Sequence, residues 1–173
     1  MSGPVYRALK ASYLAAAIQD GTQAIPSVKR KHISESVRSD FLDSLDLDEA
    51  SRPWHPTDAR WDYLLGHEPS SQVVAIETHS AETSQVSKVI QKRTASLGHL
   101  RDQLGSGHNV AAWYWAASGR VDFVPHEKTM LHLSENGIQF VGGRLEAKHL
   151  ASLSRHATHP RERRGKPRNA PRK

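Results

Sequence analysis

The chain has 173 residues, a length that fits one domain and is too short for two well-filled hydrophobic cores. It contains no cysteine, which excludes a disulfide framework, a thiolate metal site and a thiol nucleophile. A chain without cysteine is compatible with a reducing compartment, and we expect a cytoplasmic location. No run approaches the roughly 18 apolar residues of a membrane span, so we expect no membrane partner.

The positive charge of the chain is unevenly distributed. The formal net charge is +6, yet residues 155–173 contain eight Lys and Arg side chains and a single acidic one, Glu162. Residues 1–154 hold the other 16 basic and 17 acidic side chains and are nearly neutral. The last segment is rich in Arg and Pro and poor in apolar residues. We therefore predict one α/β domain over residues 1–154 and a disordered basic tail over 155–173.

Two helices are predicted in the first third of the chain. Residues 4–19 begin with a helix-starting proline and continue as an amphipathic helix, ended by Gln19 and Asp20, rather than as a signal peptide. From residue 33 to 45 apolar side chains recur at three- and four-residue steps, which predicts a second helix. The acidic run that follows, residues 43–49, lacks the glycine and distal glutamate of a calcium loop, and we interpret it as a solvated helix end.

The middle of the chain is more regular. Residues 61–66 and 72–79 are apolar or β-branched segments separated by a short turn, which predicts two adjacent antiparallel strands. The uninterrupted apolar run at 73–76 indicates a strand covered on both faces. An apolar stripe between residues 86 and 104, ended by Gly105, predicts a helix.

The remaining segments complete an α/β pattern. Residues 110–118 predict a strand with Trp113 and Trp115 on one face and Tyr114 on the other, an alternation that favours core packing over base stacking. Short apolar segments at 128–133 and 138–141 flank a turn, and residues 145–153 predict a last helix. The expected fold is a small mixed central sheet flanked by helices.

The informative side chains are Asp62 on one strand and Glu77 with His79 on the next. Residues two apart in a strand point to the same face, so Glu77 and His79 project together, and Asp62 meets them if the two strands pair in antiparallel register. Two converging carboxylates repel each other unless a cation or a proton lies between them. Hard oxygen ligands of this kind suit Mg²⁺ or Mn²⁺.

This arrangement resembles the core of the PD-(D/E)XK nuclease superfamily. The resemblance covers residues 33–145: a helix with an acidic residue (Glu35), a strand with Asp62, a strand with E-x-H at 77–79, a helix with lysines, and a further strand at 110–118. It implies that Asp62 and Glu77 bind a divalent metal. His79 stands where these nucleases have a catalytic lysine.

Some members of that superfamily carry the lysine on the following helix instead. Lys88 and Lys92 lie there, off the apolar stripe, and Lys92 is the preferred candidate. A purely structural interpretation remains open for each residue: Asp62 as a strand start, His79 as a polar strand end, and both lysines as a solvated helix face. The eleven histidines form no H-x-x-x-H motif in a helical context, so no histidine metal site is predicted.

Two functions follow from these features. The first is a metal-dependent nuclease-like protein that acts on DNA or RNA phosphodiester bonds, with Asp62, Glu77, His79 and Lys92 as its site residues and Mg²⁺ or Mn²⁺ as its cofactor. The alternative is a catalytically inactive nuclease-like fold that serves as a nucleic-acid-binding or protein-interaction module. Nucleic acid is the expected partner, through the phosphodiester site of the core and through the basic tail over 155–173, which gains salt-dependent affinity from each phosphate that it neutralises.

Overall fold

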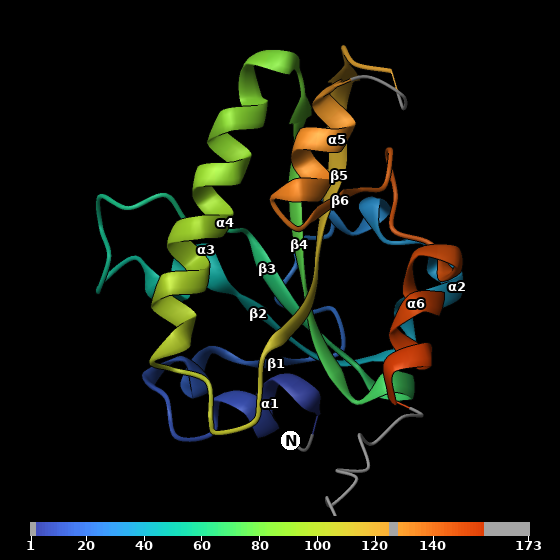
Figure 1. Ribbon diagram of the computed structural model, residues 1–173. Coiled ribbons are helices and arrows are strands. Elements are labelled where there is room, and N and C mark those ends of the chain that lie inside the picture. The colour runs from blue at the N-terminus through green and yellow to red at the C-terminus, as the bar shows by residue number, and fades with distance from the viewer. Residues whose placement is uncertain (1–2, 125–127, 158–173) are drawn as a thin grey trace, which may run out of the picture.

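The protein is built on one mixed β-sheet with helices on both faces (Figure 1). The computed structural model describes residues 3–124 and 128–157. Within them the strands are β1 (Gln19–Asp20), β2 (Phe41–Asp46), β3 (Tyr63–His67), β4 (Gln72–Ala81), β5 (Val110–Val121) and β6 (Ile138–Phe140). The strands lie side by side in chain order; β1 to β4 pair antiparallel, whereas β5 pairs parallel with β4 and β6 pairs parallel with β5. The predicted mixed sheet is confirmed.

The helices form two layers that enclose the sheet. They are α1 (Pro4–Leu9), α2 (Glu35–Arg38), α3 (Leu47–Ser51), α4 (Val86–Arg101), α5 (Lys128–Glu135) and α6 (Ala147–Ala157). The described part of the chain also contains four short 3₁₀ turns, η1 (Tyr13–Ala17), η2 (Arg30–His32), η3 (Glu68–Ser70) and η4 (Thr83–Gln85). Helices α1, α4 and α5 contribute to one buried apolar cluster, and α2 and α6 to another on the opposite face of the sheet (Figure 1). No helix in the described ranges has the length and apolar character needed to cross a membrane.

Strand β4 lies at the centre of this arrangement, between β3 and β5. Val73 and Ala75 point into the cluster under α4, whereas Val74 and Ile76 point into the opposite one. This explains the uninterrupted apolar run, because a strand covered on both faces needs no polar alternation. The predicted division of the aromatic residues on β5 is also confirmed, since Trp113 and Trp115 belong to the first cluster and Tyr114 to the second.

The predicted helix over residues 33–45 is wrong for most of its length. Only Glu35–Arg38 is helical, and Phe41–Asp46 forms β2 between β1 and β3. The pairing with β3 has a register shift between Phe41 and Asp43, which places Phe41 and Leu45 in opposite apolar clusters. The four-residue spacing of these apolar side chains imitates a helix, but long-range pairing decides the structure.

Other segments correct the prediction in smaller ways. The first helix ends at Leu9, and a separate 3₁₀ turn begins after Ser12, whose hydroxyl accepts a hydrogen bond from the backbone N–H of Leu14. Residues 128–135 form α5, and Gly137, with φ of +68°, turns the chain into β6. The last helix is present and extends to Ala157, so the first residues of the predicted tail are helical. Residues 158–173 of that tail lie outside the described residues.

Asp43 is buried rather than part of a solvated helix end. Its carboxylate accepts hydrogen bonds from the backbone N–H groups of Val5 and Tyr6, at 3.1 and 2.8 Å, and so caps the start of α1. A Cβ on Gly66 would lie 1.9 Å from Oδ1 of Asp43, so glycine is required there for the carboxylate to fit. Asp43 therefore fixes α1 on the face of the sheet that also carries α4.

Replacing Asp43 tests this contact. We expect Asp43→Ala to lower the free energy of unfolding by about 1–3 kcal/mol, because two buried N–H groups lose their acceptor. Denaturant unfolding followed by circular dichroism measures the change. The control is Asp20→Ala at an exposed position, which should change stability by less than about 0.5 kcal/mol. Equal losses in both variants would contradict the capping role.

Candidate functional site

Asp62 and Glu77 are brought together by the pairing of β3 with β4. Tyr63 pairs with Ile76 in antiparallel register, so Asp62, one residue before β3, lies opposite Glu77. The backbone N–H of Asp62 donates to Oε2 of Glu77 at 3.1 Å. Glu77 follows Val73 and Ala75 on the face covered by α4 and is fully buried. The expected convergence of these two residues is therefore present in the structure.

Lys92 of α4 joins the two carboxylates. Its Nζ atom lies 3.1 Å from Oδ1 of Asp62 and makes a second, shorter ion pair with Oε1 of Glu77. The side chains of Lys92 and Asp62 are 14% and 12% exposed, so the cluster reaches solvent only through these two residues. We call Asp62, Glu77 and Lys92 the acid–lysine cluster.

Asp62 is held in place by further partners. Its Oδ2 atom accepts hydrogen bonds from the backbone N–H and the hydroxyl of Thr78, at 3.1 and 2.8 Å. The ammonium of Lys29 lies 3.5 Å from the same oxygen and 5.4 Å from the centre of the Tyr63 ring. Both oxygens of Asp62 are therefore engaged, and a carboxylate fixed in this way has little freedom to rotate.

The pKa values of the two acids in the cluster are shifted in opposite directions. Burial acts to raise the pKa of Asp62, but Lys92, Lys29 and Thr78 outweigh it and hold this pKa below its usual value. Burial, followed by the charge of Asp62, raises the pKa of Glu77 to about 8 in spite of the contact with Lys92. Burial acts to lower the pKa of Lys92, yet the two acids outweigh it and raise that pKa. At neutral pH Asp62 and Lys92 are charged, and Glu77 titrates.

Two further groups beside the cluster, the Tyr63 hydroxyl and the Asp46 carboxyl, have raised pKa values. Burial and then the charges of Asp62, Asp46 and Glu77 raise the pKa of the Tyr63 hydroxyl. The pKa of Asp46 is raised by burial and then by neighbouring acids, Asp62 among them. Asp62 thus raises the pKa of both neighbouring groups, as it does that of Glu77.

The other predicted residues lie outside the acid–lysine cluster. The ring nitrogen Nδ1 of His79 is 3.3 Å from the Ser80 hydroxyl, and the carbonyl of His79 accepts a hydrogen bond from Trp115. Lys88 is exposed on α4, one turn before Lys92. The Glu35 side chain is 89% exposed and pairs with Arg38. Of the two lysines considered in the sequence, Lys92, the preferred candidate, contacts the carboxylates of both Asp62 and Glu77.

Two members of the site were not identified from the sequence. Thr78 follows Glu77 on β4, and its hydroxyl and backbone N–H both donate to Asp62, which lies one residue before β3 begins. Lys29 belongs to a short basic run, residues 29–31, and precedes Asp62 by 33 residues. No local sequence pattern places Lys29 near the strands. Its position beside Asp62 depends on the tertiary fold, which lays its ammonium over the Tyr63 ring.

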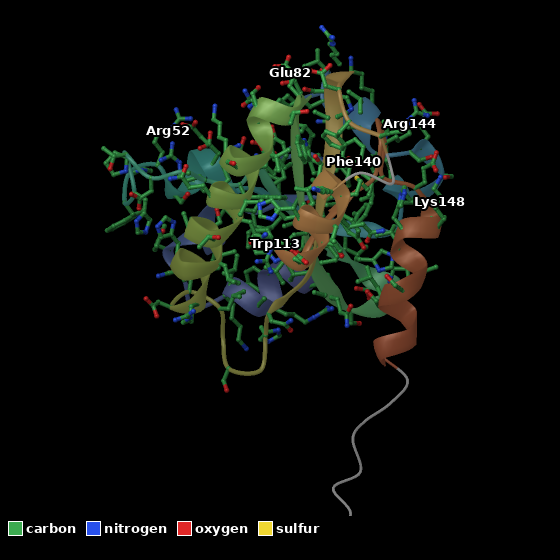
Figure 2. All side chains as sticks on the ribbon, turned by 45° about the horizontal axis from the view of Figure 1, so that its top comes forward. Arg52, Glu82, Trp113, Phe140, Arg144 and Lys148 are labelled. Carbon is green, nitrogen blue, oxygen red and sulfur yellow. The ribbon has the colours of Figure 1, made fainter. Side chains whose placement is uncertain are left out.

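The acid–lysine cluster is closed rather than hollow. A cavity of about 550 Å³ lies elsewhere, between β5, β6, α5 and α6, and is lined by residues such as Trp113, Met130 and Ile138. Figure 2 shows Trp113 and Phe140 in this part of the molecule. Glu77 is fully buried, so a substrate would meet the cluster at the exposed parts of Asp62, Lys92 and the neighbouring Lys29.

Comparison of the chain with protein-family models, curated proteins and solved structures gives no match. The assignment of a function therefore depends on the geometry of the site and on the order of its elements.

The donor atoms of the cluster fit a hard divalent cation. Asp62 and Glu77 supply carboxylate oxygens from adjacent strands, the ligand type that Mg²⁺ and Mn²⁺ prefer. Burial first and then the charge of Asp62 raise the pKa of Glu77, and the ammonium of Lys92 does not fully offset them. A bound dication would compensate the two acids, provided that Lys92 gave up at least one of its two contacts.

The stability of the metal-free protein should depend on the protonation of Glu77. Because its pKa is raised in the folded state, the stabilisation from proton uptake is complete below about pH 4.5 and is lost as the pH rises through about 8. Glu77→Gln keeps the shape of the side chain but cannot titrate. In EDTA, the unfolding free energy of the parent should therefore fall relative to this variant by at most about 1.4 kcal/mol per pH unit across that window. If the unfolding free energies of the parent and of Glu77→Gln change equally with pH in denaturant unfolding, the raised pKa of Glu77 is contradicted.

Proposed function

We propose that the chain is a metal-dependent nuclease-like protein that acts on phosphodiester bonds of DNA or RNA. The observation that carries this proposal is the acid–lysine cluster: two carboxylates on adjacent strands share one lysine from the helix that follows them. Such a set contains the metal ligands and the fixed positive charge that phosphodiester hydrolysis requires.

The order of the elements supports the same proposal. Asp62 precedes β3, Glu77 lies on β4, Lys92 lies on α4, and the parallel strand β5 follows. This order resembles the restriction-endonuclease-like core of the PD-(D/E)XK superfamily in the form that carries its lysine on the helix. His79, two residues after Glu77, then needs no role in catalysis, and its ring contacts agree with this.

Asp62 and Glu77 are the residues that would hold Mg²⁺ or Mn²⁺. A bound dication of this kind supplies Lewis acidity and a water of lowered pKa. Thr78 would keep Asp62 oriented through its N–H and hydroxyl. Lys92 would stabilise negative charge on the phosphate, and Lys29, whose side chain is partly exposed beside Asp62, would bind a neighbouring phosphate oxygen.

A cleavage assay tests the proposal. Purified protein is incubated with plasmid, single-stranded DNA and RNA in the presence of Mg²⁺, Mn²⁺ or EDTA. We expect cleavage that requires the metal and falls by at least about 100-fold in Glu77→Gln and Lys92→Met. The matched control is Lys88→Met, on the same helix but exposed, which should retain the parent rate.

Two outcomes of this assay contradict the proposal. One is the absence of cleavage of every substrate with either metal. The other is equal activity of Glu77→Gln and the parent, which would assign the observed cleavage to a contaminant or to another site. Circular dichroism of each variant shows whether a lost activity follows from a lost fold.

A second function is favoured by the closed state of the cluster. Glu77 is fully buried and Lys92 already bridges the two acids, an arrangement that also suits a catalytically inactive fold that binds nucleic acid. Its affinity would come from the seven Lys and Arg residues that follow α6, in residues 158–173.

Removal of residues 158–173 distinguishes this second function. Binding of labelled DNA and RNA is followed by fluorescence anisotropy at several salt concentrations. If the tail provides the affinity, the truncated protein should lose most of its binding and show a much flatter dependence on salt. Unchanged binding after truncation would exclude the tail as the binding element.

A further inference from the structure

A second group of possible metal ligands lies on the loop between α3 and β3 and on the facing side of α4. In Figure 1 this loop projects beside the C-terminal half of α4, and in Figure 2 Arg52, at the end of α3, marks the same side of the molecule. His55 and Asp58 belong to the loop, and His99 belongs to the last turns of α4. The three are far apart in the sequence, which is why no histidine motif revealed them.

The three side chains converge on one point. Nε2 of His99 lies 2.9 Å from Oδ2 of Asp58, and Nδ1 of His55 lies 3.3 Å from the same oxygen. The two imidazole rings are stacked, with 3.6 Å between their centres and 12° between their planes. One nitrogen of each histidine and one carboxylate oxygen all lie within 4.8 Å of one another.

These separations are close to those of a metal site. Zn²⁺ with ligands at about 2.0–2.2 Å in tetrahedral geometry keeps its ligand atoms roughly 3.3 Å apart. The two nitrogen–oxygen distances are near this size, 3.3 and 2.9 Å, and a metal would replace the hydrogen-bonding protons once the stacked rings turn so that both nitrogens point at it. All three side chains are partly exposed, which leaves a route for the ion and space for a water ligand.

The loop is held in shape independently of any ion. The guanidinium of Arg60 donates hydrogen bonds to the carbonyls of His55 and Asp58, and its Nε atom pairs with Asp48 at 2.7 Å. The backbone N–H of His55 donates to the carbonyl of Ser51 at 3.0 Å. A loop fixed in this way presents its two ligands to His99 without a large ordering cost.

We propose that His55, Asp58 and His99 form a binding site for a transition-metal ion of the Zn²⁺ class. Two imidazoles and one carboxylate are ligands that suit Zn²⁺, Co²⁺ or Ni²⁺, whereas Mg²⁺ prefers oxygen ligands alone. The site is separate from the acid–lysine cluster and does not depend on the proposed nuclease function. An ion there would link the loop that leads to Asp62 with the helix that carries Lys92, which lies two turns before His99.

Direct metal binding tests this site. The full-length protein, freed of metal with EDTA and dialysed, is titrated with Zn²⁺ by calorimetry, and Co²⁺ is added in parallel to record its visible absorption. We expect one ion per chain, a rise in the melting temperature, and a Co²⁺ spectrum of nitrogen and oxygen ligation. His99→Ala and His55→Ala should each weaken binding by at least 10-fold and abolish the spectrum.

The matched control is His108→Ala, an exposed histidine just after α4, which should bind as the parent does. Because the chain has eleven histidines, binding that survives in both His55→Ala and His99→Ala would place the ion elsewhere and overturn the proposal. Absence of Zn²⁺ and Co²⁺ binding by the folded parent would overturn it equally. His55 lies on a partly exposed loop, so its substitution tests the site with little risk to the fold.

Discussion

The contact on which the site depends is the buried ammonium of Lys92 between the carboxylates of Asp62 and Glu77. Pairing of β3 with β4 brings two acids into an apolar sheet, where their repulsion and desolvation are costly. Helix α4 carries the charge that offsets this cost, and Asp43 anchors α1 on the same face. The position of α4 over the sheet is therefore linked to the electrostatics of the site.

A buried ion cluster is a weak source of stability, because desolvation of its members can exceed their attraction. An apolar set of similar volume would fill the space beneath α4 at lower cost. The raised pKa of Glu77 has this origin, because burial disfavours the charged form of the carboxyl more than the contact with Lys92 favours it. Strongly shifted groups of this kind are typical of functional sites, and the carboxylate oxygens beside a lysine are the basis of the proposed phosphate chemistry.

The sequence predicted the part of the fold that local patterns determine. The apolar run of β4, the turn after β3 and the stripe of α4 were sufficient to place Asp62, Glu77 and Lys92 on neighbouring elements. Strand β2 was missed because Phe41 and Leu45 have helical spacing and its partner strand is distant in the chain. Lys29 and the grouping of His55 with His99 depend on loops folding back, which no local pattern encodes.

A double-mutant cycle between Lys92 and Glu77 tests the central claim most directly. The unfolding free energies of the parent, Lys92→Met, Glu77→Gln and the double variant are measured at neutral pH in EDTA. Lys92→Met alone should be the most destabilising, by about 3–5 kcal/mol, because it leaves two buried acids without their shared cation. The double variant should be more stable than the sum of the single changes predicts, by at least about 1 kcal/mol. Additivity within about 0.3 kcal/mol would show that the two side chains are not coupled and would contradict the account.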